Sequence, residues 1–433
     1  MAAPIVTINE LGQHVGETVT VRGWLYQKRS SGKISFAVLR DGTGYLQGVL
    51  ARSECDDDSF ARFDQLTQES SFTMTGTVRE EKRAPGGFEM GVQAITIVQI
   101  AAEYPISPKD HGPAFLMEHR HLWLRSSRQH AIMRVRNEII MATRQFFYER
   151  NFVIIDTPIL TGAIGETAQS LFETEYFDLG KAYLAQTGQL YVEAACVAHG
   201  RVYCFGPTFR AEKSKTRKHL NEFWMIEPEV AWADSDGNMK LQEEFVCYIV
   251  AWVLDKSRAE LATLERDVAK LEAIRAPFPK ITYDDAVTRL QKAGLPIQWG
   301  NDFGAPDEEK LMEEYERPLF VYDWPRVCKA FYMKQHPTRD DLVLCNDLLA
   351  PEGYGELIGG SQREDDHDRL LARIREQGLP EESYQWYLQL RKYGSVPHAG
   401  FGLGLERTVG WICGLDHVRE TIPFARTLSR LYP

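Results

Sequence analysis

The sequence lacks the features that mark membrane-spanning, secreted and repetitive proteins. No apolar run approaches the roughly 20 residues that a membrane helix needs, and no segment is compositionally biased or repeated at a fixed period. Residues 1–14 do not have the basic and then apolar pattern of a secretory signal. We therefore expect a cytoplasmic protein with no membrane association.

Cysteine is scarce and scattered along the chain. The 433 residues include seven cysteines, an odd number, and these form neither a C-x-x-C pair nor the Cys/His spacing of a zinc site. This pattern favours reduced and mostly buried thiols over a disulfide framework or a structural metal.

Two common nucleotide-binding motifs are also absent. There is no G-x-G-x-x-G after an early strand and no GxxxxGK[ST], so the sequence predicts neither a Rossmann nor a P-loop site. The formal net charge of −11 argues mildly against a nucleic-acid partner. A local basic stretch exists nevertheless, because residues 26–40 contain four basic residues, Lys28, Arg29, Lys33 and Arg40, and no acid.

The first 102 residues have the pattern of a small β-barrel. Short runs rich in strand-forming residues, several with alternating apolar and polar positions, are separated by turn signals such as Asp-Gly-Thr-Gly at 41–44 and Pro-Gly-Gly at 85–87. Five strands in about 100 residues are typical of the OB-fold, a barrel that binds nucleic acids. The expected strands are 19–25, 34–39, 45–50, 72–78 and 88–100.

A second domain is expected after a linker at 103–128, which contains prolines and the basic, aromatic stretch HRHLWLR at 119–125. From 129 to 433 the sequence combines a helix at 131–149 with β-rich runs at 202–209 and 223–232. Residues 241–274 are predicted to form one or two helices. Strands and helices do not alternate regularly, so we predict an α+β fold with an antiparallel sheet flanked by helices.

Three separated segments carry the chemistry. They are residues 152–160 (FVIIDTPIL), residues 209–212 (FRAE) with 221–227 (NEFWMIE) after a basic loop, and residues 400–407 (GFGLGLER). Each segment alone is a weak signal, since a Gly-x-Gly-x-Gly run is more often a close-packed turn than a ligand loop.

In this order and spacing the segments resemble the three signature motifs of class II aminoacyl-tRNA synthetases. The barrel resembles the anticodon-binding domain of the aspartate, asparagine and lysine subgroup, and the segments YLAQTGQL, HLNEFWMIEPE and GELIGGSQRE are most similar to the asparagine-specific members. The resemblance implies ATP-dependent ligation of asparagine to its tRNA through an asparaginyl-adenylate, with release of AMP and pyrophosphate. It also implies a homodimer and Mg²⁺ as a cofactor.

The resemblance assigns the ATP site. Arg210 would contact the α-phosphate and the amino-acid carboxylate, Arg407 the γ-phosphate, and Phe223 would stack on adenine. Guanidinium groups and Mg²⁺ suit a reaction in which charge builds up on phosphate oxygens. The implied catalytic residues are Arg210, Glu356 and Arg407, the Mg²⁺ ligands are Asp347 and Glu356, and the ATP-binding residues are Arg210, Glu212, Lys218, His219, Leu220, Phe223, Glu356, Gly404 and Arg407.

Two features of this site stay open. Lys218 stands where the family has arginine, so either Lys218 makes a single-point contact with ATP or Arg217 takes over. A carboxylate nucleophile is already ionised, so no general base is required, and His219 and His398 are interpreted as structural or substrate-adjacent residues.

The amino-acid site is implied to contain Glu166 at the α-ammonium group, Arg363 at the side-chain carbonyl, and Gln189, Glu193 and Arg210. The aspartate enzymes carry a lysine where this chain has Val192, and removal of a cation favours a neutral amide over a carboxylate. The direction of Glu193 is open, because it would serve either as an acid near the amide or as a surface charge.

In the barrel, the resemblance implies that Phe36 stacks on an anticodon base, Gln47 reads its edge and Arg29 contacts the backbone or a base. The alternative is that Phe36 points into the barrel core.

Three other functions compete with asparagine ligation. An aspartyl-tRNA synthetase, even one with relaxed tRNA choice, would require a lysine at Val192. A paralogue that forms asparagine by amidating aspartate would not need the barrel. A non-catalytic tRNA-binding module would have lost Arg210, Glu356 or Arg407, and all three are present.

Overall fold

The computed structural model describes residues 2–107, 109–166 and 170–433. The chain divides into two compact units, Met1–Gly112 and Pro113–Pro433. No helix in the described part of the chain is both long enough and apolar enough to cross a membrane.

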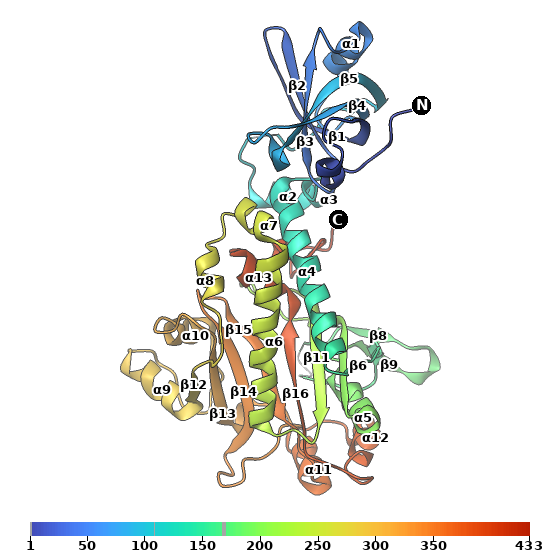
Figure 1. The fold of residues 1–433 in the computed structure, drawn as a ribbon. Helices are drawn as coiled ribbons and strands as arrows, with labels where there is room; N and C mark the ends of the chain where they lie inside the picture. The colour runs from blue at the N-terminus through green and yellow to red at the C-terminus, as the bar shows by residue number, and fades with distance from the viewer. Residues whose placement is uncertain (1, 108, 167–169) are drawn as a thin grey trace. The chain divides into compact units, whose positions relative to one another are not determined.

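The smaller unit is a closed five-stranded barrel with the strand order β1-β2-β3-β5-β4 (Figure 1). Alternate side chains of β1, such as those of Val19 and Val21, are fully buried in its core. The predicted OB-type barrel is therefore confirmed. Its strands are β1 (Thr18–Ser31), β2 (Ile34–Arg40), β3 (Tyr45–Ala51), β4 (Ser71–Glu80) and β5 (Phe88–Gln99).

One helix of this unit was not predicted. Helix α1 (Asp57–Gln65) begins after Asp56, whose side chain accepts a hydrogen bond from the backbone N–H of Ser59. Phe63 on this helix is buried in the barrel core.

The larger unit is built on an eight-stranded sheet with the order β12-β13-β14-β15-β16-β11-β10-β6. Neighbouring strands are antiparallel except for the pairs β12–β13 and β10–β6. The predicted α+β fold with a mainly antiparallel sheet is confirmed. The strands are β6 (Val153–Ile154), β10 (Arg201–Phe209), β11 (Glu222–Ala231), β12 (Lys280–Thr282), β13 (Leu319–Pro325), β14 (Leu342–Ala350), β15 (Gly355–Gln362) and β16 (His398–Gly404).

Helices α4 (Ser127–Glu149) and α6 (Ser235–Lys256) run side by side across the sheet, as Figure 1 shows. Together with α13 (Leu405–Cys413) they enclose the main apolar core of this unit. The stretch 241–274 forms parts of three helices rather than one or two, because α6 is followed by α7 (Arg258–Thr263) and α8 (Val268–Glu272). Asp267 caps the last of these.

Part of the segment predicted as a linker, 103–128, belongs to the larger unit. Residues 113–123 form α2 (Pro113–Glu118) and α3 (Arg120–Trp123). The side chain of Arg120 is buried and donates hydrogen bonds to the carbonyls of Ile422 and Pro423 near the end of the chain.

The remaining elements lie around the central sheet. Helix α5 begins at Gln189, and α10 lies beside β14 and β15. These elements are the small sheet β7 (Leu160–Thr161), β9 (Lys181–Leu184) and β8 (Glu173–Glu175), and the helices α5 (Gln189–His199), α9 (Tyr283–Lys292), α10 (Ala305–Met312), α11 (His367–Glu376) and α12 (Gln385–Gln389).

Candidate functional site

The central strands of the large sheet line a cavity of about 310 Å³. Glycines on β15 and β16 bring the backbone close to it, and they are closely packed: a Cβ atom on Gly402 would lie 2.6 Å from Cε of Met225, and one on Gly360 would lie 2.5 Å from Nε2 of Gln242. The glycine-rich segment at 400–404 is therefore a strand that borders a ligand-sized space.

Predicted site residues from segments far apart in the sequence lie together in the lining of this cavity. Every predicted ATP-binding, metal-binding and amino-acid-binding residue lines it, with the exception of Glu193. The lining residues are Glu166, Gln189, Arg210, Glu212, Lys218, His219, Leu220, Phe223, Asp347, Glu356, Arg363, Gly404 and Arg407.

Two arginines lie in this cavity with few partners of their own. Arg210, directly after β10, has its Nη2 3.6 Å from Oε1 of Glu166 and its guanidinium carbon 5.5 Å from the ring centre of Phe223. Its Nε is buried and donates to no acceptor among the described residues. Arg407, in the first turn of α13, donates to the carbonyl of Glu356 at 2.7 Å. Both guanidinium groups keep donors for an anion.

Lys218 lies in the loop between β10 and β11. Its Nζ is 3.6 Å from Oε1 of Glu309 and 3.8 Å from Oε2 of Glu308, and it is buried with no hydrogen-bond acceptor in the described part of the chain. Burial raises the pKa of Glu308 to about 7, and the charge of Glu356 adds to this effect. Arg217 does not line this cavity.

The carboxylates of Asp347 and Glu356 flank one small space. A Cβ atom on Gly359 would lie 3.0 Å from Oε1 of Glu356 and 3.8 Å from Oδ1 of Asp347, so only a glycine leaves this space open. The other oxygen of Asp347 accepts a hydrogen bond from Lys329 at 2.9 Å. Two carboxylate oxygens facing one space fit a hard divalent cation.

Lys329 is an additional basic residue of the cavity. Its Nζ is paired with Asp347 and, at 3.2 Å, with Asp302, and it lies 3.7 Å from the ring centre of Trp324. Burial opposes its charge, but these two carboxylates hold the pKa of Lys329 well above its usual range.

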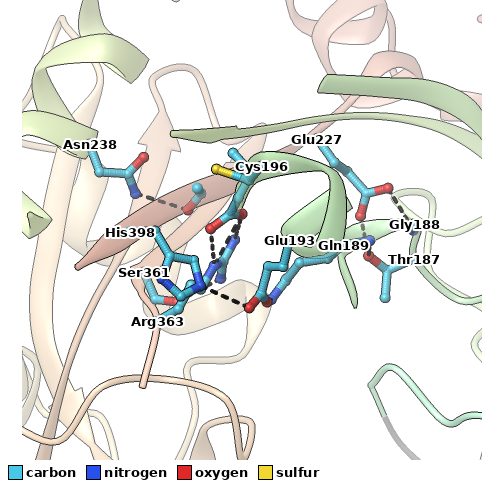
Figure 2. Close-up of polar contacts among 12 residues, drawn as sticks. Thr187, Gly188, Gln189, Glu193, Cys196, Glu227, Asn238, Ser361, Arg363 and His398 are labelled. Carbon is cyan, nitrogen blue, oxygen red and sulfur yellow. Dashed lines mark hydrogen bonds and ion pairs between the residues drawn. The ribbon is translucent and has the colours of Figure 1, made fainter. Parts of the chain in front are cut away.

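A buried arginine, Arg363, forms another part of the cavity wall. Nε and Nη2 of Arg363 each donate to Glu229, with shortest contacts of 3.0 Å, and Nη1 donates to Ser361 at 2.7 Å (Figure 2). The side chains of Arg363 and Glu229 are 2% and 1% exposed. This bidentate pair fixes the guanidinium plane at the cavity wall.

Glu193 is not a surface charge. Its side chain is fully buried behind the cavity wall, and both of its oxygens accept hydrogen bonds from neighbouring side chains. His398 is one of these neighbours and is therefore a structural residue of this wall (Figure 2). Unlike the other predicted amino-acid-binding residues, Glu193 has no surface in the cavity.

Val192 is also turned away from the cavity. It is 1% exposed and packs in an apolar cluster with Cys196, Val202 and Cys204. No cation reaches the cavity from this position, where the aspartate enzymes carry a lysine.

Sequence reasoning missed Glu229, Glu308 and Lys329. Glu229 has a partial signal, because β11 has an apolar run at 223–226 and an acid in the strand that follows it is expected to need a buried partner. Glu308 and Lys329 lie in segments without a recognisable motif. The fold brings Lys329 into the lining of the cavity and Glu308 to within 3.8 Å of Nζ of the lining residue Lys218.

On the barrel, Arg29, Phe36 and Gln47 come together on adjacent strands. The guanidinium carbon of Arg29 lies 4.4 Å from the ring centre of Phe36, and its Nη2 donates to Oε1 of Gln47 at 3.4 Å. Phe36 is only partly buried and is not part of the barrel core, so the inward alternative is excluded.

Comparison with known proteins agrees with this geometry. The family of class II tRNA synthetases (D, K and N) matches residues 113–428, and an OB-fold nucleic acid binding domain matches residues 19–98. The chain is 56% identical to an asparagine–tRNA ligase of Chloroflexus aurantiacus, over 99% of both chains, and 55% identical to one of Koribacter versatilis, over 100% of this chain and 99% of that one.

Among solved structures, the asparaginyl-tRNA synthetase of Pyrococcus horikoshii complexed with asparaginyl-adenylate superimposes with a TM-score of 0.95. It is 44% identical and covers 99% of each chain. The barrel, the cavity and these similarities lead to one assignment: the chain belongs to the class II tRNA synthetases of the D, K and N group and, within it, to the asparagine–tRNA ligases.

Proposed function

We propose that this chain activates L-asparagine with ATP, forms asparaginyl-adenylate and transfers the asparaginyl group to tRNA, with release of pyrophosphate and AMP. The observation that carries the proposal is a cavity lined by two kinds of arginine. Arg210 and Arg407 have few hydrogen-bond partners, whereas Arg363 is buried and bonded to Glu229. Such a cavity suits a polyphosphate beside the first two and a small polar amino acid beside Arg363.

The proposed chemistry needs positioning and charge neutralisation. The asparagine carboxylate attacks the α-phosphorus of ATP in line, and the bond to the pyrophosphate leaving group breaks. Arg210, which is close to both Glu166 and Phe223, is proposed to bridge the carboxylate and the α-phosphate. Arg407 takes the γ-phosphate with the donors that its bond to Glu356 leaves free.

The remaining ATP contacts are proposed from the lining of the same cavity. Phe223 stacks on adenine, while Glu212, His219, Leu220 and Gly404 shape the nucleoside pocket, and Lys218 contacts the phosphates as a point charge.

Asp347 and Glu356 are the proposed Mg²⁺ ligands, because an oxygen of each faces the space over Gly359. A Mg²⁺ ion held there would neutralise charge on the ATP phosphates. Lys329 keeps the second oxygen of Asp347 in place through its ammonium group.

Asparagine is favoured over aspartate by the charge balance around Arg363. The charge of Arg363 is already compensated by Glu229, and position 192 supplies no further cation. An aspartate carboxylate would therefore lose its hydration without gaining an unpaired cation, whereas a neutral amide would not carry this cost.

The barrel is proposed to bind the anticodon through Arg29, Phe36 and Gln47. Phe36 offers an aromatic face for stacking, and Gln47 offers an amide edge that can discriminate between bases. The seven free cysteines, five of them buried, support a reducing compartment such as the cytoplasm.

A homodimer is proposed from the apolar surface around β6 and β7. Val153, Ile154, Ile159 and Leu160 are each 41–46% exposed along this edge of the larger unit. Sedimentation as a species of 49.5 kDa at micromolar concentration would contradict the dimer.

The decisive experiment is amino-acid-dependent ATP–pyrophosphate exchange, with asparagine and aspartate assayed in parallel. We expect exchange with asparagine and background exchange with aspartate. Exchange with aspartate alone would assign the chain to the aspartate enzymes, and exchange with neither would exclude amino-acid activation.

A further inference from the structure

Glu193 lies at the centre of a buried network that joins α5, α12 and β16. Figure 2 shows three of its members, Gln189, Glu193 and His398. Oε1 of Glu193 accepts from Nε2 of Gln189 at 3.1 Å and from the hydroxyl of Tyr387 at 2.7 Å. Its Oε2 accepts from Nη2 of Arg391 at 2.7 Å and from Nε2 of His398 at 3.0 Å. With both oxygens bonded twice, Glu193 cannot contact a substrate directly.

The His398 ring is held by acceptors on both sides. Nδ1 lies 2.8 Å from the carbonyl of Val396, and Nε2 faces the carboxylate of Glu193. Two acceptors require a proton on each ring nitrogen, and this agrees with a pKa of His398 that is raised: burial lowers it, but the bond to Glu193 outweighs burial. His398 is therefore an imidazolium that helps to keep Glu193 ionised.

This network does not fit a metal site. Donor atoms of Glu193, Glu229 and His398 lie within 4.8 Å of one another. The two carboxylates are, however, already bonded to the guanidinium groups of Arg391 and Arg363, which a metal ion would have to displace. The cluster is therefore an ion-pair network whose effect is to fix side chains.

Gln189 is the member of this network that reaches the cavity. An amide has a donor end and an acceptor end, and an ionised carboxylate can only accept. Because Nε2 of Gln189 faces Glu193, its Oε1 must point away from Glu193. No hydrogen bond to this oxygen is made by the described residues.

We infer that Glu193 is a positioning residue that orients the Gln189 amide so that Oε1 accepts a hydrogen bond from the α-ammonium group of the amino-acid substrate. This inference rests on the proposed function and specifies how one of its pocket residues acts. The second acceptor of the ammonium, Glu166, lines the same cavity.

A neutral amide is the suitable partner for Glu166 at this place. Burial already raises the pKa of Glu166, and the nearby carboxylates of Glu227 and Glu356 add to this effect. A second acid at position 189, next to an intact Glu193, would favour proton uptake by the group and weaken its hold on a cation. An oriented amide oxygen supplies an acceptor without further negative charge.

The test compares four variants in asparagine-dependent ATP–pyrophosphate exchange. In Glu193→Gln, the new amide can donate its N–H to Oε1 of Gln189. The Gln189 amide is then free to turn, so that its nitrogen rather than its oxygen faces the cavity. We expect KM for asparagine to rise roughly 10- to 100-fold, the size of one lost hydrogen bond to a charged group, with KM for ATP unchanged. Gln189→Met, which leaves the ion pairs in place, is expected to have the same effect.

The double variant Gln189→Glu/Glu193→Gln should restore binding. A carboxylate at position 189 has oxygen at both ends, so one oxygen accepts from the new amide at position 193 and the other faces the substrate whichever way the group turns. KM for asparagine should return to within about 5-fold of the wild type, since the lost hydrogen bond is remade.

The matched control is Tyr387→Phe, which removes a different hydrogen bond to the same Oε1 of Glu193. Its melting temperature should fall, but KM for asparagine should change less than about 3-fold, because the bond to Gln189 remains. Succinamate, which is asparagine without its α-amino group, should compete equally well against the wild type and Glu193→Gln.

Three results would overturn the inference: an unchanged KM in Gln189→Met, no recovery in a folded double variant, or weaker succinamate inhibition in Glu193→Gln. These are distinct from failure of the proposed function, in which the wild type itself shows no asparagine-dependent exchange.

Discussion

The two ends of the cavity are built differently. At the proposed amino-acid end, Arg363 and Glu229 are almost fully buried and bonded to each other in a bidentate pair. At the proposed nucleotide end, Arg210 and Arg407 are 27% and 29% exposed and have few protein partners. The donors of Arg363 are bonded to protein acceptors, whereas Arg210 keeps a buried donor without an acceptor among the described residues.

This difference agrees with what each end is proposed to recognise. Asparagine and aspartate differ by a single polar group, so discrimination requires charges and donors that are already fixed and shielded from water. ATP offers several phosphate oxygens, and these can order partly exposed arginines when the nucleotide binds. The predictions below test this contrast in order of decreasing effect.

The largest effect is expected from Arg363→Lys at the amino-acid end. Lysine cannot reproduce the bonds of Arg363 to both Glu229 and Ser361, and a buried carboxylate is left incompletely paired. We expect kcat/KM for asparagine in pyrophosphate exchange to fall roughly 100- to 1,000-fold, with KM for ATP nearly unchanged. An unchanged activation rate would remove Arg363 from the amino-acid site.

A smaller and opposite pattern is expected from Arg407→Gln at the nucleotide end. Within the described part of the chain its side chain donates a hydrogen bond to the backbone carbonyl of Glu356 and lies 3.6 Å from the Glu356 carboxylate, and it is 29% exposed, so its loss should destabilise the fold only slightly. KM for ATP should rise roughly 10- to 100-fold, since a charge-assisted contact is lost, and KM for asparagine should stay within about 2-fold. The matched control is Arg375→Gln, which breaks the exposed pair with Glu381 and should affect neither constant.

The two ends also differ in how far the sequence predicts them. The residues proposed for the nucleotide end belong to contiguous motifs. Arg210, Phe223 and Arg407 could therefore be predicted as members of one site from the motifs alone, and all three line the cavity. The barrel and the antiparallel sheet likewise follow from local alternation and turn signals. Lys329, which lines the cavity, and Glu308, which lies beside the lining residue Lys218, could not be placed, because both come from segments without a motif.

Glu193 marks the limit of sequence reasoning at the amino-acid end. Its direction depends on Tyr387, Arg391 and His398, which lie about 200 residues further along the chain. Local pattern cannot distinguish such a buried network from a surface charge on α5, because both have the same helical position. The breaks between α6, α7 and α8 were not predicted for a similar reason, because packing against other elements sets them rather than the periodicity of the sequence.

A modest gain is expected from Lys218→Arg, which restores the residue that the family has at this position. The ammonium of Lys218 has two carboxylates within 4 Å but no hydrogen bond among the described residues. A guanidinium group can pair with Glu308 and still donate to a phosphate oxygen. KM for ATP should fall about 2- to 5-fold, as one added charge-assisted bond permits, and a rise in KM would contradict an open nucleotide end.

The smallest effect, on stability rather than on catalysis, concerns Glu308 on α10. Burial and the charge of Glu356 raise its pKa from 4.5 to about 7, so between these pH values the folded protein binds a proton that the unfolded chain does not. The contribution of Glu308 to the free energy of unfolding must therefore fall as pH rises from 4.5 to 7 and level off above that. Glu308→Gln has no such proton, so its stability relative to the wild type should increase across this window.

Urea unfolding of the ligand-free protein at about pH 5 and about pH 8 measures this difference. The matched control is Glu309→Gln, which also removes a carboxylate beside Lys218 but from a side chain that is 46% exposed. Because solvent screens an exposed acid, this control should show little change of stability with pH. Equal changes in both variants would mean that the nucleotide end is as well balanced in charge as the amino-acid end, and the contrast between them would then lie in hydrogen bonding alone.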